Sequence, residues 1–157
     1  MTQFPSPPPA GHDRALVVST VCSGSQPAHA LGREAYSYQY VVRAFAPLLK
    51  RWGLVAQVDR AESRLDFAIH QSRRKGLDPI HLAFAPLHLV YLTSQAPNIA
   101  FPFWEFPDIP CEDAPDNPRL NWARIASRLD LILTASKFTR EAFQRAGVKT
   151  PVHVGGT

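Results

Sequence analysis

Residues 131–154, LILTASKFTREAFQRAGVKTPVHV, contain one complete strand–helix–strand unit. The apolar run at residues 131–135 has the length of a buried strand, and Ser136 follows it at the position of a helix N-cap. The apolar face of the helix consists of Phe138, Ala142, Phe143 and Ala146. Gly147 predicts the end of that helix, and residues 151–154 predict the next strand. Two strands joined by a helix are typical of a parallel sheet, because a parallel connection has to cross one face of the sheet.

The same alternation continues towards the N-terminus. Further strands are predicted at residues 15–21, 54–58, 80–85 and 98–104, and further helices at residues 34–52, 61–75 and 118–129. Pro47 predicts a kink, or the start of a second helix, inside residues 34–52, and Gly53 is interpreted as a C′ residue. The pattern predicts an α/β fold, with a doubly wound parallel sheet in a single Rossmann-like domain at residues 14–157. Residues 1–13 are predicted to be a disordered, proline-rich lead.

Composition excludes several classes of protein. The chain has 157 residues, of which 45% are hydrophobic and 19% charged, as expected for one globular domain. It contains no run of about 18 apolar residues, so we expect no transmembrane segment. Residues 4–9, FPSPPP, cannot form the apolar helix of a secretory signal, which makes a cytoplasmic location the default. Cys22 and Cys111 are expected to be reduced thiols there.

Charge is unevenly distributed along the chain. The net charge is +4, but residues 76–118 contain no lysine or arginine. That stretch carries the carboxylates Asp78, Glu105, Asp108, Glu112, Asp113 and Asp116. Without a continuous basic stripe, the chain is not expected to bind nucleic acid. The acidic loop at residues 105–117 is predicted to be mobile and to border an open cleft, since it is rich in carboxylates and prolines and has no cation to pair those carboxylates.

Ligands of doubly wound sheets bind at the carboxyl ends of the strands, which selects two groups of candidate residues. In the loop after the first strand, Gly24, Ser25 and Gly32 could let backbone amides approach a phosphate. Their spacing matches neither the G-x-G-x-x-G motif nor the P-loop motif. A simple turn explains the two glycines equally well. At the end of the fourth strand, Glu105 could bind sugar hydroxyls or act as a base beside the stacking face of Trp104. Alternatively, Trp104 packs under the acidic loop and Glu105 is solvated.

The histidines show no spacing that suggests a zinc site, so we expect no metal. His70 is expected on the surface and His81 as a hydrogen-bonded residue of the core. His29 and His88 are the two histidines on candidate cleft loops. No serine triad is recognisable. The serines and glycine at residues 19–25 resemble, weakly, the FMN phosphate loop of flavodoxin-like proteins.

The second half of the chain contains a series of motifs in a specific order. Residues 102–110 read PFWEFPDIP, residues 129–148 read LDLILTASKFTREAFQRAGV, and PVHV follows at residues 151–154. This series resembles the N-terminal domain of family 4 glycosyltransferases of the GT-B fold. The resemblance spans about residues 15–154 and rests on the order of the motifs.

The resemblance implies a division of labour between two domains. In that family the N-terminal domain mainly binds the acceptor, and the C-terminal domain holds a nucleotide-sugar, which is a substrate rather than a tightly bound cofactor. The resemblance places Gly24, Ser25 and Gly32 against the donor phosphates. It places Trp104 and Glu105 in the acceptor cleft, and it makes Ser136, at the motif serine, and its neighbour Lys137 further candidates for the cleft. The main role expected of Ser136 is helix capping.

The family continues past this point into a second Rossmann-like domain, whereas this sequence ends at Thr157. The chain is therefore expected to be the acceptor half of a glycosyltransferase, truncated before its donor domain and inactive alone. Its partners would be a nucleotide-sugar, an unknown acceptor and, through an exposed interdomain face, a second copy of itself. The alternatives are a stand-alone binding or interaction domain without catalysis and a flavodoxin-like FMN carrier.

Overall fold

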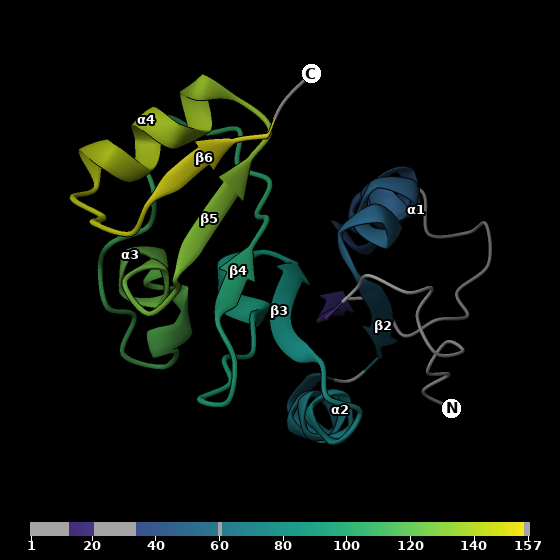
Figure 1. The fold of residues 1–157 in the computed structure, drawn as a ribbon. Helices are drawn as coiled ribbons and strands as arrows, with labels where there is room; N and C mark the ends of the chain where they lie inside the picture. The colour runs from purple at the N-terminus through teal and green to yellow at the C-terminus, as the bar shows by residue number, and fades with distance from the viewer. Residues whose placement is uncertain (1–12, 21–33, 60, 156–157) are drawn as a thin grey trace.

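The computed structural model describes residues 13–20, 34–59 and 61–155, with backbone only for residues 34–36. These residues form one six-stranded sheet in the order β2-β1-β3-β4-β5-β6, in which every pair of neighbours is parallel (Figure 1). The strands are β1 (Arg14–Thr20), β2 (Leu54–Val58), β3 (Asp78–Phe84), β4 (Asn98–Ala100), β5 (Leu131–Thr134) and β6 (Val152–Val154). The helices are α1 (Glu34–Trp52), α2 (Ala61–Arg74), α3 (Trp122–Ala126) and α4 (Lys137–Arg145), with 3-10 turns η2 (Leu87–Leu89) and η3 (Pro118–Leu120).

The Rossmann-like α/β fold predicted from the alternation of strands and helices is therefore confirmed. Several predicted features lie outside the described residues, namely the lead at residues 1–12 and Cys22, Gly24, Ser25, His29 and Gly32. The direction of strand addition reverses between β1 and β3, because β2 lies on one side of β1 while β3 to β6 follow on the other. Ligands of doubly wound sheets bind at such a switch point.

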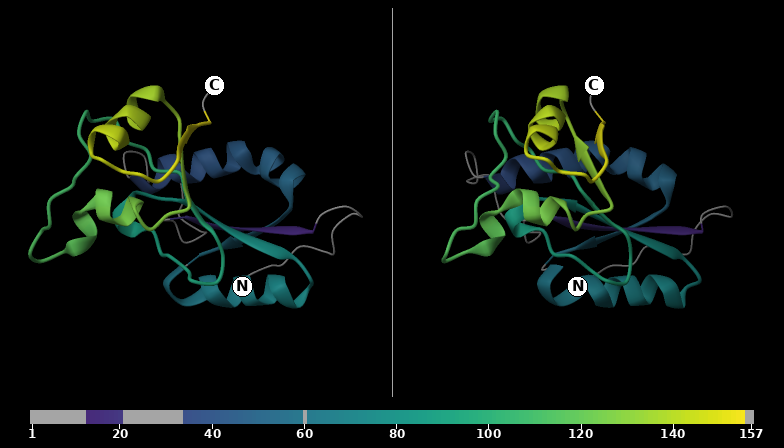
Figure 2. Two further views of the ribbon diagram at one scale, coloured as in Figure 1. Left: turned by 60° about the vertical axis from the view of Figure 1, so that its left-hand side comes forward. Right: turned by 90° about the vertical axis from the view of Figure 1, so that its left-hand side faces the viewer.

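Alternate residues of the central strands point to opposite faces of the sheet, as the period of a strand requires. Leu16 and Val18 pack with α1 in one cluster of buried residues, whereas Val17 packs with α2 in another. The third cluster places α3 and α4 against Ala83 and Ile132. In this arrangement α1 covers one face, and α2, α3 and α4 cover the other; Figure 2 shows α1 and α2 on opposite sides of the strands.

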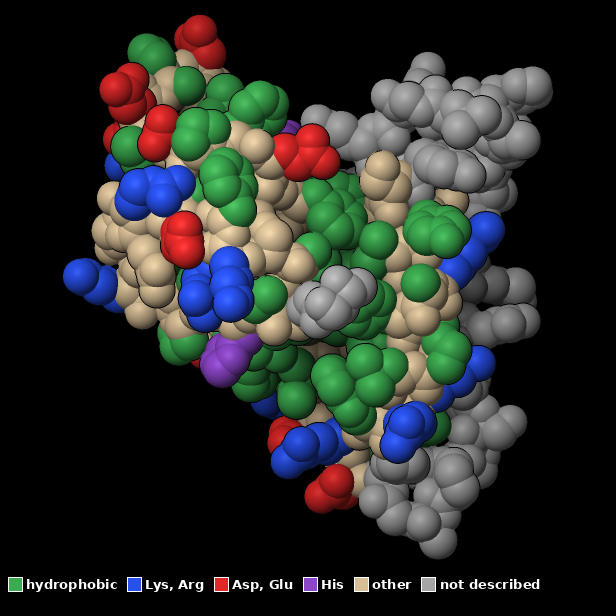
Figure 3. All heavy atoms as spheres, turned by 90° about the horizontal axis from the view of Figure 1, so that it is seen from above, with side chains coloured by type: hydrophobic (Ala, Val, Ile, Leu, Met, Phe, Trp, Pro, Cys, Tyr) green, Lys and Arg blue, Asp and Glu red, His purple; other side chains and the backbone are tan. Residues whose placement is uncertain are grey.

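The described part of the face beside α1 is not fully buried. Half-buried hydrophobic residues there include Ile80, Ile99, Phe103 and Leu133. Seen from above in Figure 3, hydrophobic side chains gather along the middle of the molecule, between the α4 side and the α1 side. No helix among the described residues is long and apolar enough to cross a membrane.

Strand β4 is shorter than its sequence predicts. The apolar run at residues 98–104 predicted a strand of that length, but regular pairing ends at Ala100. Phe101 still donates its N–H to Ala83 O at 2.8 Å, and Pro102, which has no N–H, cannot continue the ladder. The chain after Phe101 is therefore free to leave the sheet, and it leads directly into the candidate site.

Two features of α1 and its C-terminal end differ from the predictions. Helix α1 runs through Pro47 as one 19-residue helix, so the predicted alternative of a second helix starting there is wrong. Gly53 follows α1 without a positive φ, unlike Gly76 (φ 73°) and Gly147 (φ 74°), so it is not a left-handed C′ residue. Gly53 is required for a different reason: a Cβ there would lie 2.7 Å from the backbone oxygen of Arg14.

The predicted helix at residues 118–129 is two separate elements. Asn117 accepts a hydrogen bond from Arg119 N and starts only the short turn η3. Asn121 then provides a second cap, accepting from Arg124 N at the start of α3. The break between the two elements redirects the chain, so that residues of both η3 and α3 contribute to the cavity described below.

Candidate functional site

A cavity of about 580 Å³ opens at the carboxyl ends of β3 and β4, next to the switch point of the sheet. Its aromatic lining consists of Tyr38, Phe103, Trp104, Phe106 and Trp122. Its polar side chains are Ser37, His88 and Glu105, with prolines and Leu120 completing the wall among the described residues. Pockets of this size, mostly apolar with a few polar groups, are typical of small-molecule sites.

Helix α1 and the segment after β4 form one wall of the cavity together. The Tyr38 hydroxyl accepts a hydrogen bond from Phe103 N at 2.9 Å, and the two ring centroids lie 4.7 Å apart. Tyr38 is only 2% exposed, although it also lines the cavity. The same side chain therefore anchors α1 in the core and fixes the course of the chain just before Trp104.

Trp104 has both of the roles that the sequence left as alternatives. Its indole lines the cavity and also packs, half-buried, against the core cluster of α3 and α4. Its ring centroid lies 4.5 Å from that of Trp122 and 5.2 Å from that of Phe106. Its Nε1–H donates to Asp108 O at 3.1 Å, which closes the first turn of the acidic loop over the ring. The adjacent Glu105 is exposed and lies on the rim.

Ser136 and Lys137 are near this wall but are not among the residues lining the cavity. The Ser136 hydroxyl accepts from Thr139 N at 3.1 Å and caps α4, as its position in the sequence predicted. The Thr139 hydroxyl in turn donates to Trp104 O at 2.9 Å. Ser136 therefore affects the site through the start of α4, while Lys137 is an exposed residue of the first turn.

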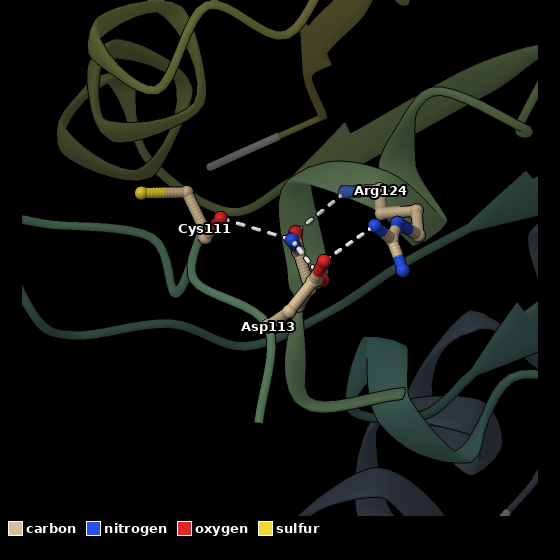
Figure 4. Close-up of polar contacts among 4 residues, drawn as sticks. Cys111, Asp113 and Arg124 are labelled. Carbon is tan, nitrogen blue, oxygen red and sulfur yellow. Dashed lines mark hydrogen bonds and ion pairs between the residues drawn. The ribbon is translucent and has the colours of Figure 1, made fainter. Parts of the chain in front are cut away.

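The acidic loop is attached to α3, which corrects the expectation that no cation pairs its carboxylates. Arg124 Nη2 lies 2.6 Å from Asp113 Oδ2, and the Asn121 amide donates to Asp113 Oδ1 and to Cys111 O, both at 2.9 Å (Figure 4). Ile109 is buried in the core and holds the middle of the loop down. The pairing cation comes from beyond the acidic stretch, so inspection of residues 76–118 alone could not reveal it.

Arg119 is a second cation whose role the sequence did not reveal. Its Nε donates to His88 O at 2.7 Å, and its Nη2 donates to Val90 O at 2.5 Å. The guanidinium also lies 5.0 Å from the centroid of the Tyr91 ring. These contacts join η3 to the segment after β3, which brings His88 and Leu120 to the same cavity.

Comparison with known proteins does not assign the chain to a family. No family model and no curated protein matches the sequence. Among the described residues, no group of three or more histidine, cysteine, aspartate and glutamate side chains could hold a metal ion.

His81 takes part in a buried network rather than in the cavity, as predicted for a hydrogen-bonded core histidine. Its Nε2 lies 2.7 Å from Ser19 Oγ, and its Nδ1 lies 3.1 Å from Asn98 Oδ1. The Asn98 side chain extends the network to Thr93, which donates to Asp66 Oδ1 at 2.6 Å. Ser19 and His81 are 4% and 0% exposed, so this serine–histidine pair joins β1, β3 and β4 and has no access to a substrate.

Two polar side chains of the cavity, Glu105 and His88, are able to exchange hydrogen bonds or protons with a ligand. Glu105 carries the only carboxylate of the described lining, and it can accept a hydrogen bond, or a proton, from a hydroxyl group. The His88 ring is hydrogen-bonded to Trp122, with Trp122 Nε1 3.2 Å from His88 Nδ1. His70, in contrast, is exposed on α2, as its position in the sequence predicted.

Proposed function

We propose that this domain binds the acceptor in a glycosyl transfer reaction, in the manner of the N-terminal domain of a GT-B glycosyltransferase. The observation that carries the proposal is the aromatic cavity with a carboxylate on its rim, at the carboxyl ends of β3 and β4. Trp104 and Glu105, which the strand-end rule selects and the motif resemblance also implies, line that cavity together. An acceptor hydroxyl placed there would be within reach of Glu105.

The donor side of the reaction needs groups beyond the described cavity. Transfer from a nucleotide-sugar requires positive charge or aligned dipoles around the departing diphosphate. The described lining contains no lysine or arginine. The residues proposed to contact donor phosphates, Gly24, Ser25 and Gly32, lie outside the described residues. We therefore propose that the described cavity binds the acceptor and does not hold the donor diphosphate by itself.

Calorimetric titration of the 157-residue protein with a panel of glycosides and other hydroxyl-bearing acceptors tests the proposal. Trp104→Phe retains an aromatic ring but removes the N–H that holds Asp108 O. We expect this variant to weaken acceptor binding about tenfold, because a ring and a loop of the site are both displaced.

Trp52→Phe is the matched control, because Trp52 is 54% exposed on α1 and is not a residue of the lining. Its affinity for the acceptor should equal that of the wild-type protein. The proposal is wrong if no glycosyl acceptor binds, or if both variants weaken binding equally. Turnover of a nucleotide-sugar by the 157-residue protein, surviving repurification, would contradict its role as an acceptor-binding domain alone.

The strand order favours a second candidate function. The order β2-β1-β3-β4-β5 is that of flavodoxin-like proteins, which bind FMN at the switch point between the first and third strands. The aromatic cavity lies beside this point, and a flavin ring could stack there. Titration with FMN separates the two functions, since binding quenches flavin fluorescence, whereas an acceptor-binding domain leaves it unchanged.

A further inference from the structure

The polar atoms of three aromatic side chains in the cavity are engaged within the protein. Trp104 Nε1 donates to Asp108 O, Trp122 Nε1 donates to His88 Nδ1, and the Tyr38 hydroxyl accepts from Phe103 N. An indole has one N–H and no acceptor. Both tryptophans therefore present only carbon and their aromatic faces to a ligand.

The hydrogen bond from Trp122 also selects the tautomer of the neutral His88 ring. Because an indole can only donate, His88 Nδ1 has to accept, and the ring proton lies on Nε2. The two rings are tilted by 32° with centroids 5.9 Å apart, which keeps the imidazole against the indole. Among the described residues, neither His88 Nε2 nor the Glu105 carboxylate has a hydrogen-bond partner. The cavity thus offers a ligand one N–H donor and one carboxylate acceptor on an otherwise apolar wall, apart from Ser37.

This distribution of polar groups selects between classes of ligand. A sugar ring buried in the cavity would bring several hydroxyl groups, and the described lining offers a side-chain partner to few of them. Each unsatisfied hydroxyl costs about 1–3 kcal/mol. A flat apolar ring gives up no hydrogen bonds when it enters the cavity, and it gains stacking and edge contacts with the aromatic lining.

We infer that the cavity takes the apolar ring system of a hydroxylated aromatic acceptor, with its hydroxyl group hydrogen-bonded to Glu105, and that any sugar on the acceptor stays outside. This inference rests on the proposed function, because it names the class of acceptor that the proposed site binds. The volume of about 580 Å³ accommodates a fused pair of aromatic rings with room to spare.

Three probes that share parts test the inference by calorimetric titration of the wild-type protein. 2-Naphthol carries only the ring system, methyl β-glucoside carries only the sugar, and 2-naphthyl β-glucoside carries both. We expect both naphthyl compounds to bind at least about tenfold more tightly than methyl β-glucoside. Equal binding of methyl β-glucoside and 2-naphthol would overturn the inference and leave the proposed function standing.

The role of Glu105 is tested with a pair of ligands that differ in one hydrogen-bond donor. Glu105→Gln should weaken 2-naphthol about tenfold, because a charged acceptor is lost, and should leave 2-methoxynaphthalene unchanged. Glu112→Gln, an exposed position of the same acidic loop outside the lining, is the matched control and should change neither. An equal effect of Glu105→Gln on both ligands, or no effect on either, would contradict the assignment of Glu105. Failure of 2-naphthol to bind the wild-type protein would overturn the inference itself.

Discussion

Burial keeps the His81 imidazole neutral. Loss of solvent lowers the pKa of His81 from its usual 6.5, and the hydrogen bond with Asn98 and the charge of Asp66 only partly oppose this. A neutral imidazole suits the network, because one ring nitrogen can donate while the other accepts. The residue is thus a structural link whose protonation would cost folding free energy.

A histidine with a lowered pKa in the folded protein binds a proton more readily in the unfolded chain. We therefore predict that the free energy of unfolding falls as the pH drops from about 6.5 towards the folded-state pKa of His81. The slope from this one group is at most about 1.4 kcal/mol per pH unit, and its contribution is fully present above the unfolded pKa. Urea titrations at pH values from 5 to 8 measure it.

Two variants isolate the contribution of His81. His81→Gln should be less stable than the wild type at pH 8, and its stability should depend less on pH between 5 and 7. His70→Gln changes an exposed histidine of α2 and should keep the wild-type pH profile. A His81→Gln profile parallel to that of the wild type would show that other groups cause the pH dependence.

For a single residue, the sequence predicts whether the side chain is buried better than it predicts which residues the side chain contacts. The position of His81 in an apolar strand indicated that it is buried. Its partners Ser19 and Asn98 come from β1 and β4, 62 and 17 residues away. Those contacts depend on which strands are neighbours and on their register, so no local pattern contains them.

Among the elements, α4 links helix capping to the candidate site. We predict that Ser136→Ala destabilises the protein by about 1 kcal/mol, because Thr139 N loses its acceptor. It should also weaken ligand binding slightly, since Thr139 holds the backbone of Trp104. Thermal melting and the calorimetric titrations measure the two effects. Lys137→Ala, one residue along and exposed, is the control and should change stability by less than about 0.5 kcal/mol.

The junction of α1 and β2 depends on the size of one residue. Gly53→Ala would place a Cβ 2.7 Å from Arg14 O, a backbone atom that cannot rotate away. We predict a loss of about 1–3 kcal/mol, typical of overpacking in a buried position. Gly155→Ala is the control, because a Cβ there meets nothing within 4 Å. If urea denaturation gives the same free energy for both variants, the close approach to Arg14 is not a constraint.

Whether a segment forms a helix or a strand was predictable where the signal is a local sequence pattern. The length of an element was not predictable where tertiary contacts determine it. Ser136 and Gly147 mark the ends of α4 in the sequence, and the structure confirms both. The run that begins at Asn98 looked like a strand of seven residues, but its second half packs against α1 and the cavity instead of a neighbouring strand. Hydrophobicity indicates burial in both cases and does not distinguish a strand from a buried irregular segment.

At the scale of the whole molecule, the fold follows from the sequence and the site follows only in part. The alternation of strands and helices predicted the sheet, and the strand-end rule selected Trp104 and Glu105. Tyr38, Phe106 and Trp122 were missed as lining residues, because they reach the cavity from three separate segments. The aromatic character of those residues was visible in the sequence, but their convergence was not.

Exposed aromatic residues near the cavity favour association of two copies, and self-association remains a prediction. Phe106, 64% exposed, should contribute to such a contact, because burying apolar surface stabilises complexes. Phe106→Ser should raise the dimer dissociation constant about tenfold or more in sedimentation experiments. Phe67→Ser removes a similarly exposed ring (57%) on α2 and should have no effect. A wild-type protein that stays monomeric at every concentration would contradict the prediction.

The order of strands also sets an order of assembly while the chain is being synthesised. β1 pairs with β2 and β3, so it acquires its second neighbour only after Phe84 has left the ribosome. From then on β4, β5 and β6 are added in chain order, each beside the strand made just before it. At about 5–20 residues per second, these additions follow one another within seconds. Since β4, β5 and β6 have only three or four residues each, the strand newly added at the growing side of the sheet is short after each of these steps, and a short edge strand limits mispairing with other chains.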